Sequence, residues 1–400
     1  METYEYSFIL TKQLPSGAVT KIGVAGSGNL EVIIKPGAES NLTKIEVHTS
    51  MPGFKNLWDE VIKRFITDYP FNGLHIELFD SAATPQVVSL RLRQAIETYQ
   101  TGYHKKARYS EAGARNRIYS LVDEGSFNEF LLDTNTLSPT LPDLCMQGES
   151  DDGVVIGTAG FAGAEVAIAS QQKDFIGGSV GEIHGAKIIG LVKYAIKHHF
   201  LALVFLIDSG GVRLQEANVG EIEISEIIRA ILEARSSGIK TIGVVCGTNG
   251  AFGGMGIVCG TLDYLIVNQG ARIGISGAEV IQAVKGTEVF DSHDRALVWR
   301  VYGARTRYLQ QAVQAYTNNT MKDIRDCIIN ALDELKKQPI LNLDSVQEEQ
   351  KRLQQRTANS CDCHEQGQLI ARDDPKLAEQ DIFDCSDATF LSLAQQRRHS

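Results

Sequence analysis

The sequence predicts a small α+β domain followed by an α/β domain within one chain. Its 400 residues exceed the length at which a single hydrophobic core stops growing. Short strand-like runs dominate the first hundred residues, whereas glycine-rich turns between apolar strands and helices recur later. We therefore divide the chain into a first domain at 1–100, a link at 101–108, a second domain at 109–337, and a polar, partly helical or disordered tail at 338–400.

The first domain opens with short apolar or alternating runs that are typical of successive antiparallel strands. These runs lie at 4–10, 18–25, 29–35 and 43–49. Apolar residues at helical spacing then predict a helix around residues 58–66, and strand character returns at 73–78. A second helix is expected to start at Pro85, in the first helical position, and to end near Gly102. The polar, basic link that follows is long enough to let the first domain swing over the second.

In the second domain, an apolar strand, a glycine turn and a helix follow one another twice. The strand at 203–207 runs into Asp208-Ser209-Gly210-Gly211, and the strand at 241–246 runs into a glycine-rich turn at 247–256. Continuous apolar strands are expected where both faces of a sheet are covered. The other expected elements are a hairpin at 154–158 and 164–169, helices at 188–195 and 219–236, strands at 264–267 and 272–275, and mostly helix from 291 to 337.

Composition and charge argue against several classes of partner. The formal net charge is −10 without a compensating basic block, so nucleic acid is not an expected ligand. No signal peptide is apparent at the N-terminus, and the uncharged stretch 241–262 is too rich in glycine for a membrane span. Seven cysteines at irregular spacing indicate reduced thiols, and we expect a cytoplasmic protein.

Two strand-to-helix glycine turns in one sheet can aim several backbone N–H groups at a single point. Such a site suits an enolate or thioester oxygen that develops negative charge. On the residues alone, the alternative that the glycines only serve tight turns stays open. Phosphate sites are disfavoured, because no P-loop occurs and Gly254, Gly256 and Gly260 have the wrong spacing for a dinucleotide fingerprint. The possible zinc ligands Cys361, Cys363, His364 and Cys385 form a weak pattern, and we expect no metal.

The order of motifs after residue 150 resembles the carboxyltransferases of acyl-CoA carboxylases. The segments that carry this resemblance are Phe-Ile-Gly-Gly-Ser-Val-Gly at 175–181, Asp-Ser-Gly-Gly-Val-Arg-Leu-Gln-Glu at 208–216, Gly253-Gly254, and Ile-Gly-Ile-Ser-Gly-Ala at 273–278. The resemblance covers about residues 109–330 and implies a crotonase-like ββα superhelix. It also implies that the catalytic groups are the backbone amides of Gly210, Gly211, Gly253 and Gly254, which would polarise a thioester carbonyl.

The first domain carries a second resemblance. The segment Gly-Val-Ala-Gly-Ser-Gly-Asn-Leu-Glu-Val at 23–32 resembles the attachment segment of the malonate decarboxylase acyl carrier protein, the delta subunit, and Ala83-Thr84-Pro85 also fits. Cys145 stands alone, so the zinc-ribbon cysteines of bacterial acetyl-CoA carboxylase are missing. The whole chain thus looks like the delta subunit of a biotin-independent malonate decarboxylase fused to its beta subunit. Asn29, where Asp is expected more often, and the fusion itself depart from the family pattern.

This resemblance implies a covalent phosphoribosyl-dephospho-CoA group on Ser27 and conversion of malonyl-S-carrier to acetyl-S-carrier and CO2. The implied partners are a gamma subunit that supplies the second carboxyltransferase half, an alpha subunit that exchanges acetyl for malonyl, and a prosthetic-group transferase. Arg213 either contacts the prosthetic arm or pairs with Glu216, and His184 is expected to be a capping or packed residue.

Two alternatives remain open at this point. One is a subunit of a biotin-dependent acyl-CoA carboxyltransferase, which is disfavoured because the chain has its own carrier and no Ala-Met-Lys-Met-type biotinyl segment, so no biotin is expected. The other is a non-catalytic carrier and scaffold subunit.

Overall fold

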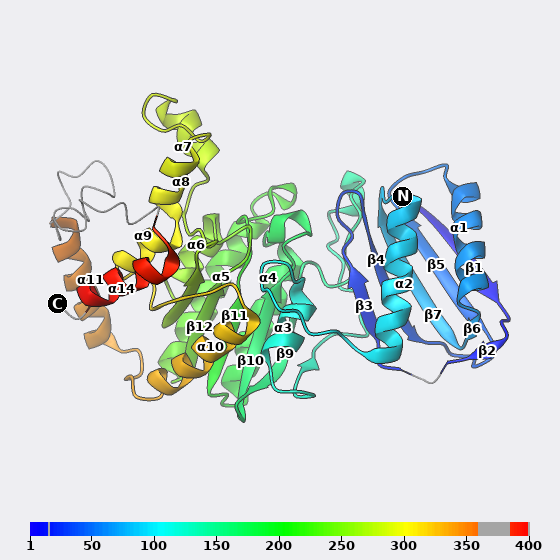
Figure 1. Cartoon of the computed structure of the whole chain (residues 1–400), viewed down its shortest axis with the longest axis horizontal. Helices are drawn as coiled ribbons and strands as arrows, with labels where there is room; N and C mark the ends of the chain where they lie inside the picture. Colours follow the sequence, from blue (N-terminus) through cyan, green and yellow to red (C-terminus); the bar gives the residue numbers. More distant parts are fainter. Residues whose placement is uncertain (15–16, 359–384, 399–400) are drawn as a thin grey trace.

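A computed structural model describes residues 1–14, 17–358 and 385–398 of the chain. Two domains lie side by side along the long axis of the molecule (Figure 1). The first, blue to cyan, contains a five-stranded sheet, and the second, green to orange, contains a seven-stranded sheet. Within the described part of the chain, no helix combines the length and the hydrophobicity needed to cross a membrane.

The sheet of the first domain has the order β1-β5-β7-β4-β3. Its strands are β1 (Glu2–Phe8), β3 (Thr20–Gly23), β4 (Asn29–Pro36), β5 (Thr43–Thr49) and β7 (Leu74–Ser81), while β2 (Lys12–Gln13) pairs with β6 (Phe71–Asn72). The pairs β1–β5 and β3–β4 are antiparallel, in line with the prediction for the first four runs, whereas β5 and β7 are parallel. The reason is that helix α1 (Lys55–Asp68) lies between them, and a helical crossover returns the chain in the same direction. Helices α1 and α2 (Pro85–Thr101) pack on one face of the sheet, and α2 begins at Pro85 as predicted (Figure 1).

The sheet of the second domain has the order β14-β13-β12-β11-β10-β9-β8 and is parallel from β10 to β14. Its strands are β8 (Asn128–Glu129), β9 (Val154–Phe161), β10 (Ala164–Gln171), β11 (Ala202–Leu206), β12 (Lys240–Val245), β13 (Tyr264–Asn268) and β14 (Ala315–Thr317). Residues 272–275 do not form the expected strand. Arg272 and Ile273 make only isolated bridges, to Gly303 and Ala251, because this segment lies beyond the end of the sheet.

Helices cover both faces of this second sheet and create two hydrophobic cores. Helices α4 (Glu182–Lys197), α5 (Val219–Ser236) and α6 (Gly253–Cys259) bury apolar residues against one face. Helices α3 (Ala114–Leu121) and α10 (Met321–Leu335) do so against the other face. This double coverage explains why β11 and β12 are buried along their whole length.

The tail contributes to the core of the second domain. Helix α11 (Leu343–Ala358) is largely exposed, but Phe390 in helix α14 (Asp387–Arg398) is only 1% exposed. The ring of Phe390 lies 5.1 Å from that of Tyr316, and Asp387 forms an ion pair with Arg305 at 2.9 Å. The helical character of the tail was predicted, but its packing against the second domain was not.

The two domains contact each other through buried polar groups. Lys21 Nζ lies 3.0 Å from Asp151 Oδ1, and the side chains are 1% and 5% exposed. Glu31 accepts hydrogen bonds from both the backbone N–H and the hydroxyl of Ser150, at 2.9 and 2.6 Å. In the link, the Tyr103 hydroxyl bonds to the backbone N–H and carbonyl of Lys21. The link that was expected to let the first domain swing is therefore anchored in this structure.

Replacing Lys21 with Met is expected to weaken the contact between the domains. Burial alone would raise the pKa of Asp151, but the charges of Arg115 and Lys21 hold it below its usual range, so this carboxylate is ionised and needs its partners. Removing one partner of a buried pair typically costs about 3 kcal/mol. We expect a lower Tm and faster proteolysis within 103–108. The exposed Lys12, changed to Met, is the matched control, and equal Tm and cleavage rates for both variants would contradict the prediction.

Candidate functional site

Ser27 lies at the tip of a tight turn between β3 and β4. The Asn29 N–H donates to the Gly26 carbonyl at 2.9 Å, which closes a β-turn with Ser27 and Gly28 at its centre. Gly28 has φ +73°, a conformation that glycine adopts without steric cost. The Gly28 N–H also donates to the Ser81 carbonyl at 2.7 Å, which fixes the turn to β7. The turn thus holds an exposed serine hydroxyl on a rigid support.

Asn29, the departure from the family pattern, has a structural role in this turn. Its Oδ1 accepts hydrogen bonds from the Leu30 N–H at 2.9 Å and from Arg91 Nε at 3.0 Å. Arg91 belongs to α2, so this bond ties the Ser27 turn to the helix that covers the sheet.

Ser27 lines a pocket that both domains form, with a volume of about 370 Å³. The first domain contributes residues of the Ser27 turn together with Ser50 and Ser81. The second domain contributes the segments 145–147 and 174, 176 and 177. The two domains are in close contact here, since a Cβ built on Gly26 would lie 2.7 Å from the carbonyl oxygen of Asp174. Ser27 therefore lies beside the glycine-rich turn at 175–181, which follows β10.

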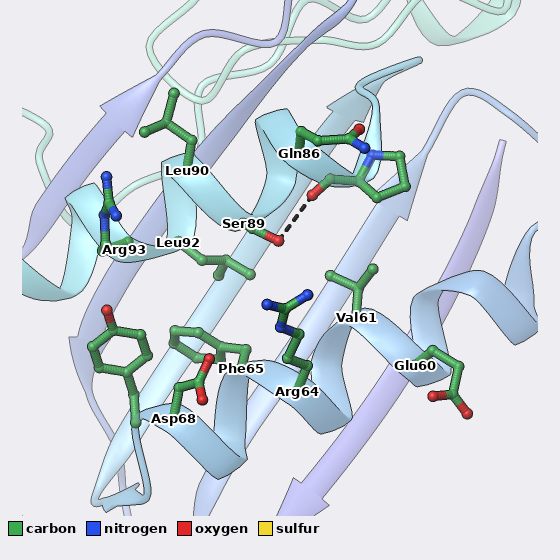
Figure 2. A pocket seen from close by; sticks show the side chains of 12 residues that line it. Glu60, Val61, Arg64, Phe65, Asp68, Gln86, Ser89, Leu90, Leu92 and Arg93 are labelled. Atoms are coloured by element: carbon green, nitrogen blue, oxygen red, sulfur yellow. Dashed lines mark hydrogen bonds between the residues drawn. The ribbon is translucent and has the colours of Figure 1, made fainter.

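A larger groove of about 710 Å³ lies on the first domain between α1 and α2 (Figure 2). Figure 2 shows Arg64 of α1 extending toward α2, above an apolar floor that includes Phe65 and Leu92. Charged residues of both signs, such as Arg64 and Asp68, line this groove, so it has no clear preference for an anion. None of the residues predicted for the site lines it.

Three glycine-rich turns pack against one another at the ends of β10, β11 and β12. The Gly210 N–H donates to the Gly177 carbonyl at 2.9 Å, which joins the first turn to the second. The Ser209 N–H donates to the Gly250 carbonyl at 2.7 Å, which joins the second to the third. A Cβ built on Gly253 would lie 3.2 Å from the Cα of Gly211. The structure thus brings together the two turns that the sequence singled out.

The backbone amides of these turns differ in their availability. The Gly210 N–H is bonded to Gly177, and the Gly253 N–H donates to the Ile275 carbonyl at 3.0 Å. The Gly211 N–H donates to the Ser209 hydroxyl at 3.1 Å. By contrast, the Gly254 N–H, in the first turn of α6, finds no acceptor among the described residues.

Val212 is a further candidate that sequence reasoning missed. Its N–H also has no acceptor within the described part of the chain, and its nitrogen lies 4.0 Å from the Cβ position of Gly253. The parallel bridge between Val180 and Val212 explains this. The Val180 N–H donates to the Gly211 carbonyl, and the Val180 carbonyl accepts from the Arg213 N–H. In a parallel pair this pattern leaves the Val212 N–H pointing away from Val180. No side-chain motif in the sequence indicates that the backbone N–H of Val212 is without an acceptor. The pairing of the strands, which only the fold reveals, would have been needed to find it.

Arg213 is fully enclosed, with 0% exposure. Its Nη1 lies 2.9 Å from Asp152 Oδ1 and 2.7 Å from Glu216 Oε1. Of the two roles considered for Arg213, the structure shows the ion pair with Glu216. His184 is also fully buried, and its Nδ1 lies 3.2 Å from the Asp152 carbonyl. Burial and the charge of Arg213 lower the pKa of His184 well below its usual value, so it is a neutral packed residue, as expected.

Among the residues that the structure describes, no group of three or more His, Cys, Asp or Glu side chains could hold a metal ion. Cys361, Cys363 and His364 lie outside the described residues. Cys385 is described, and its sulfur lies 3.8 Å from Arg305 Nη1.

Comparison with known proteins matches each domain to a family. The family model described as carboxyl transferase domain matches residues 108–364. The model described as malonate decarboxylase delta subunit matches residues 18–99. The chain is 36% identical over 216 residues to the malonyl-S-ACP:biotin-protein carboxyltransferase of Malonomonas rubra, covering 50% of this chain and 68% of the relative. It is 41% identical over 104 residues to the malonate decarboxylase acyl carrier protein of Stenotrophomonas maltophilia, covering 26% of this chain and 97% of the relative.

Among solved structures, the chain is similar to a chain of a Pseudomonas malonate decarboxylase hetero-tetramer in complex with malonate. The TM-score is 0.60 and the identity 31%, and the match covers 66% of this chain and 96% of that chain.

Proposed function

Because the chain belongs to the carboxyl transferase family and carries a malonate decarboxylase carrier domain, we propose that it unites two components of a malonate decarboxylase. The first domain would carry the acyl group on Ser27, and the second would remove CO2 from malonyl thioester. The observation that carries this proposal is that Ser27 and Gly177, beside the glycine turns, line one pocket.

The surroundings of Ser27 fit a bulky covalent group. The side chain is exposed, and a Cβ on the neighbouring Gly28 would meet no atom of the described residues within 4 Å, so a transfer enzyme has access to the hydroxyl. Phosphoribosyl-dephospho-CoA, when attached there, supplies a thiol on a long arm that binds malonyl as a thioester. Asn29 and Ser81 hold the turn in place, while the Ser27 hydroxyl bonds to none of the described residues.

The amides of Gly254 and Val212 are the groups best placed to stabilise the reaction. Loss of CO2 from a malonyl group leaves negative charge on the thioester oxygen, and unbonded N–H groups at a fixed position stabilise such charge. Gly211 is a third candidate, since its N–H is bonded only to a hydroxyl that can rotate. Gly210 and Gly253 then act by fixing the turns, because their own amides are bonded to carbonyls.

The surface next to the glycine turns supports a partner subunit. Four apolar side chains, those of Leu214, Ile275, Val284 and Val289, are 68–79% exposed. Helices α7 (Ala278–Lys285) and α8 (Arg295–Tyr302) project from the body of the domain in Figure 1. We infer that this surface receives a gamma subunit, the second carboxyltransferase half. An alpha subunit would exchange acetyl for malonyl, and a separate transferase would modify Ser27.

Release of labelled CO2 from malonate by the purified native complex tests this function. We expect release to continue unchanged when avidin is added, because the proposed reaction uses no biotin. Inhibition by avidin would instead support the second candidate, a carboxyltransferase that passes the carboxyl group to biotin. That candidate deserves the test because the Malonomonas rubra relative is named for transfer to a biotin protein. A biotin-dependent decarboxylase inhibited by avidin is the matched control.

A further inference from the structure

A fully buried ion pair lies beneath the second and third glycine turns. Asp208 begins the second turn, and its Oδ2 lies 2.6 Å from Nη2 of Arg117, which comes from α3. Both side chains are 0% exposed. The Arg117 guanidinium lies over the ring of Tyr109 at 4.3 Å, and its Nε donates to the Tyr109 carbonyl at 3.3 Å.

The other oxygen of the Asp208 carboxylate binds the third turn. Oδ1 accepts hydrogen bonds from the N–H groups of Asn249 at 2.7 Å and Gly250 at 3.2 Å. The Asp208 carboxylate packs tightly against Gly247, since a Cβ built on Gly247 would clash with Asp208 Oδ2 at 1.9 Å. The Asp208 N–H is itself bonded to Gln171 Oε1 at 3.1 Å. One carboxylate therefore connects α3, the second turn and the third turn.

Stability alone does not account for this pair. Buried ion pairs can often be replaced by apolar residues without loss of stability, because burial of the charges is costly. Arg117 Nη1 is also buried without a hydrogen-bond partner among the described residues, which adds to the cost. Such a pair is better explained by the geometry that it fixes.

We propose that Arg117 and Asp208 are positioning residues that hold the third turn in register with the second. The turn leads directly into α6, so its position sets the position of the Gly254 N–H relative to the Val212 N–H. Neither side chain touches the acyl group in this proposal. The catalytic part of the inference rests on the proposed function, whereas the structural part does not.

Two double variants of the full chain, each assembled with its partner subunits, test the inference. Arg117→Gln/Asp208→Asn removes both charges but keeps an oxygen that accepts from the Asn249 and Gly250 amides. Arg117→Met/Asp208→Leu removes the charges and the acceptor. We expect the first variant to stay within about threefold of wild type in kcat. In the second, kcat should fall about 10²-fold, the loss typical of a misplaced catalytic group, with KM for malonate within about twofold.

Hydrogen exchange provides a readout that does not depend on activity. Amides in 247–256 should exchange at least about tenfold faster in the Met/Leu variant and at the wild-type rate in the Gln/Asn variant. Equal exchange and equal kcat in the two variants would overturn the proposal. If wild type itself releases no CO2 from malonate, the proposed function fails, while exchange still decides the structural part.

A single variant provides a second route in case the Met/Leu variant does not fold. Gly247→Ala keeps Arg117 and Asp208 but places a methyl group against the carboxylate. The same acceleration of exchange and the same fall in kcat are expected. Wild-type exchange and turnover in Gly247→Ala would count against the proposal.

Discussion

Replacing Ser27 with Ala is expected to abolish turnover, with a loss of more than about 10³-fold in CO2 release from malonate. Without the hydroxyl there is no attachment point, so the acyl group is no longer delivered to the glycine turns at high local concentration. The measurement has two parts. Isotope release from labelled malonate gives the rate, and mass spectrometry of the peptide around residue 27, from protein made in its native host, shows whether a phosphoribosyl-dephospho-CoA adduct is present.

Ser50 and Ser81 provide matched controls for this experiment. Both line the same pocket as Ser27, so Ser50→Ala and Ser81→Ala remove a hydroxyl from the same surroundings. The bond from the Gly28 N–H to the Ser81 carbonyl uses backbone only and survives the change. Both controls should keep the adduct and the activity. An active native complex with an unmodified Ser27 peptide would refute the carrier function.

Replacing Gly254 with Val is expected to lower kcat by about 10²-fold, which corresponds to losing one backbone donor to the developing charge. A Cβ at this position would lie 2.5 Å from Cγ1 of Ile224 in α5, so the start of α6 must shift away. The shift moves the Gly254 N–H, which has no acceptor among the described residues. Single-turnover CO2 release from the malonyl-loaded complex measures the effect on the chemical step.

Gly190 offers a control of the same type. It lies within α4, and a Cβ there would meet nothing within 4 Å in the part of the chain that the structure describes, so Gly190→Val tests the general cost of valine in a helix of this domain. The double variant Gly254→Val/Ile224→Ala relieves the clash and should recover part of the rate. Full turnover in Gly254→Val would favour the alternative of a non-catalytic carrier and scaffold.

Local patterns predicted most of the elements of the fold. The helix expected at 219–236 is α5, with the same bounds, and Pro85 marks the start of α2. These signals are short-range, since they depend on helical spacing and on the residue at the first helical position. Strand pairing was harder to predict from local patterns. The parallel pair β5–β7 and the isolated bridges at 272–273 depend on partners far away in the sequence.

In the candidate site, too, local sequence predicted some features, whereas others depend on residues that are distant in the sequence. Glycine spacing located the turns correctly, because close packing of turns excludes larger residues. It did not reveal which amides are free, since Gly253 donates to Ile275 and Val212 carries no motif. Arg213 belongs to a motif of the family, yet its partner Asp152 lies 61 positions away and could not be inferred.

By itself, the sequence determined most of the two domains' secondary structure, the exposed serine turn and the glycine turns, because each depends on neighbouring residues and on backbone conformation. Only the tertiary structure decided that Ser27 lines one pocket with Gly177, and that Lys21 and Glu31 are buried against the second domain. In a sequence, such charged residues look like surface residues. Their burial is possible only because the fold places Asp151 and Ser150 opposite them, and the energy of a buried charge depends on partners that local sequence does not specify.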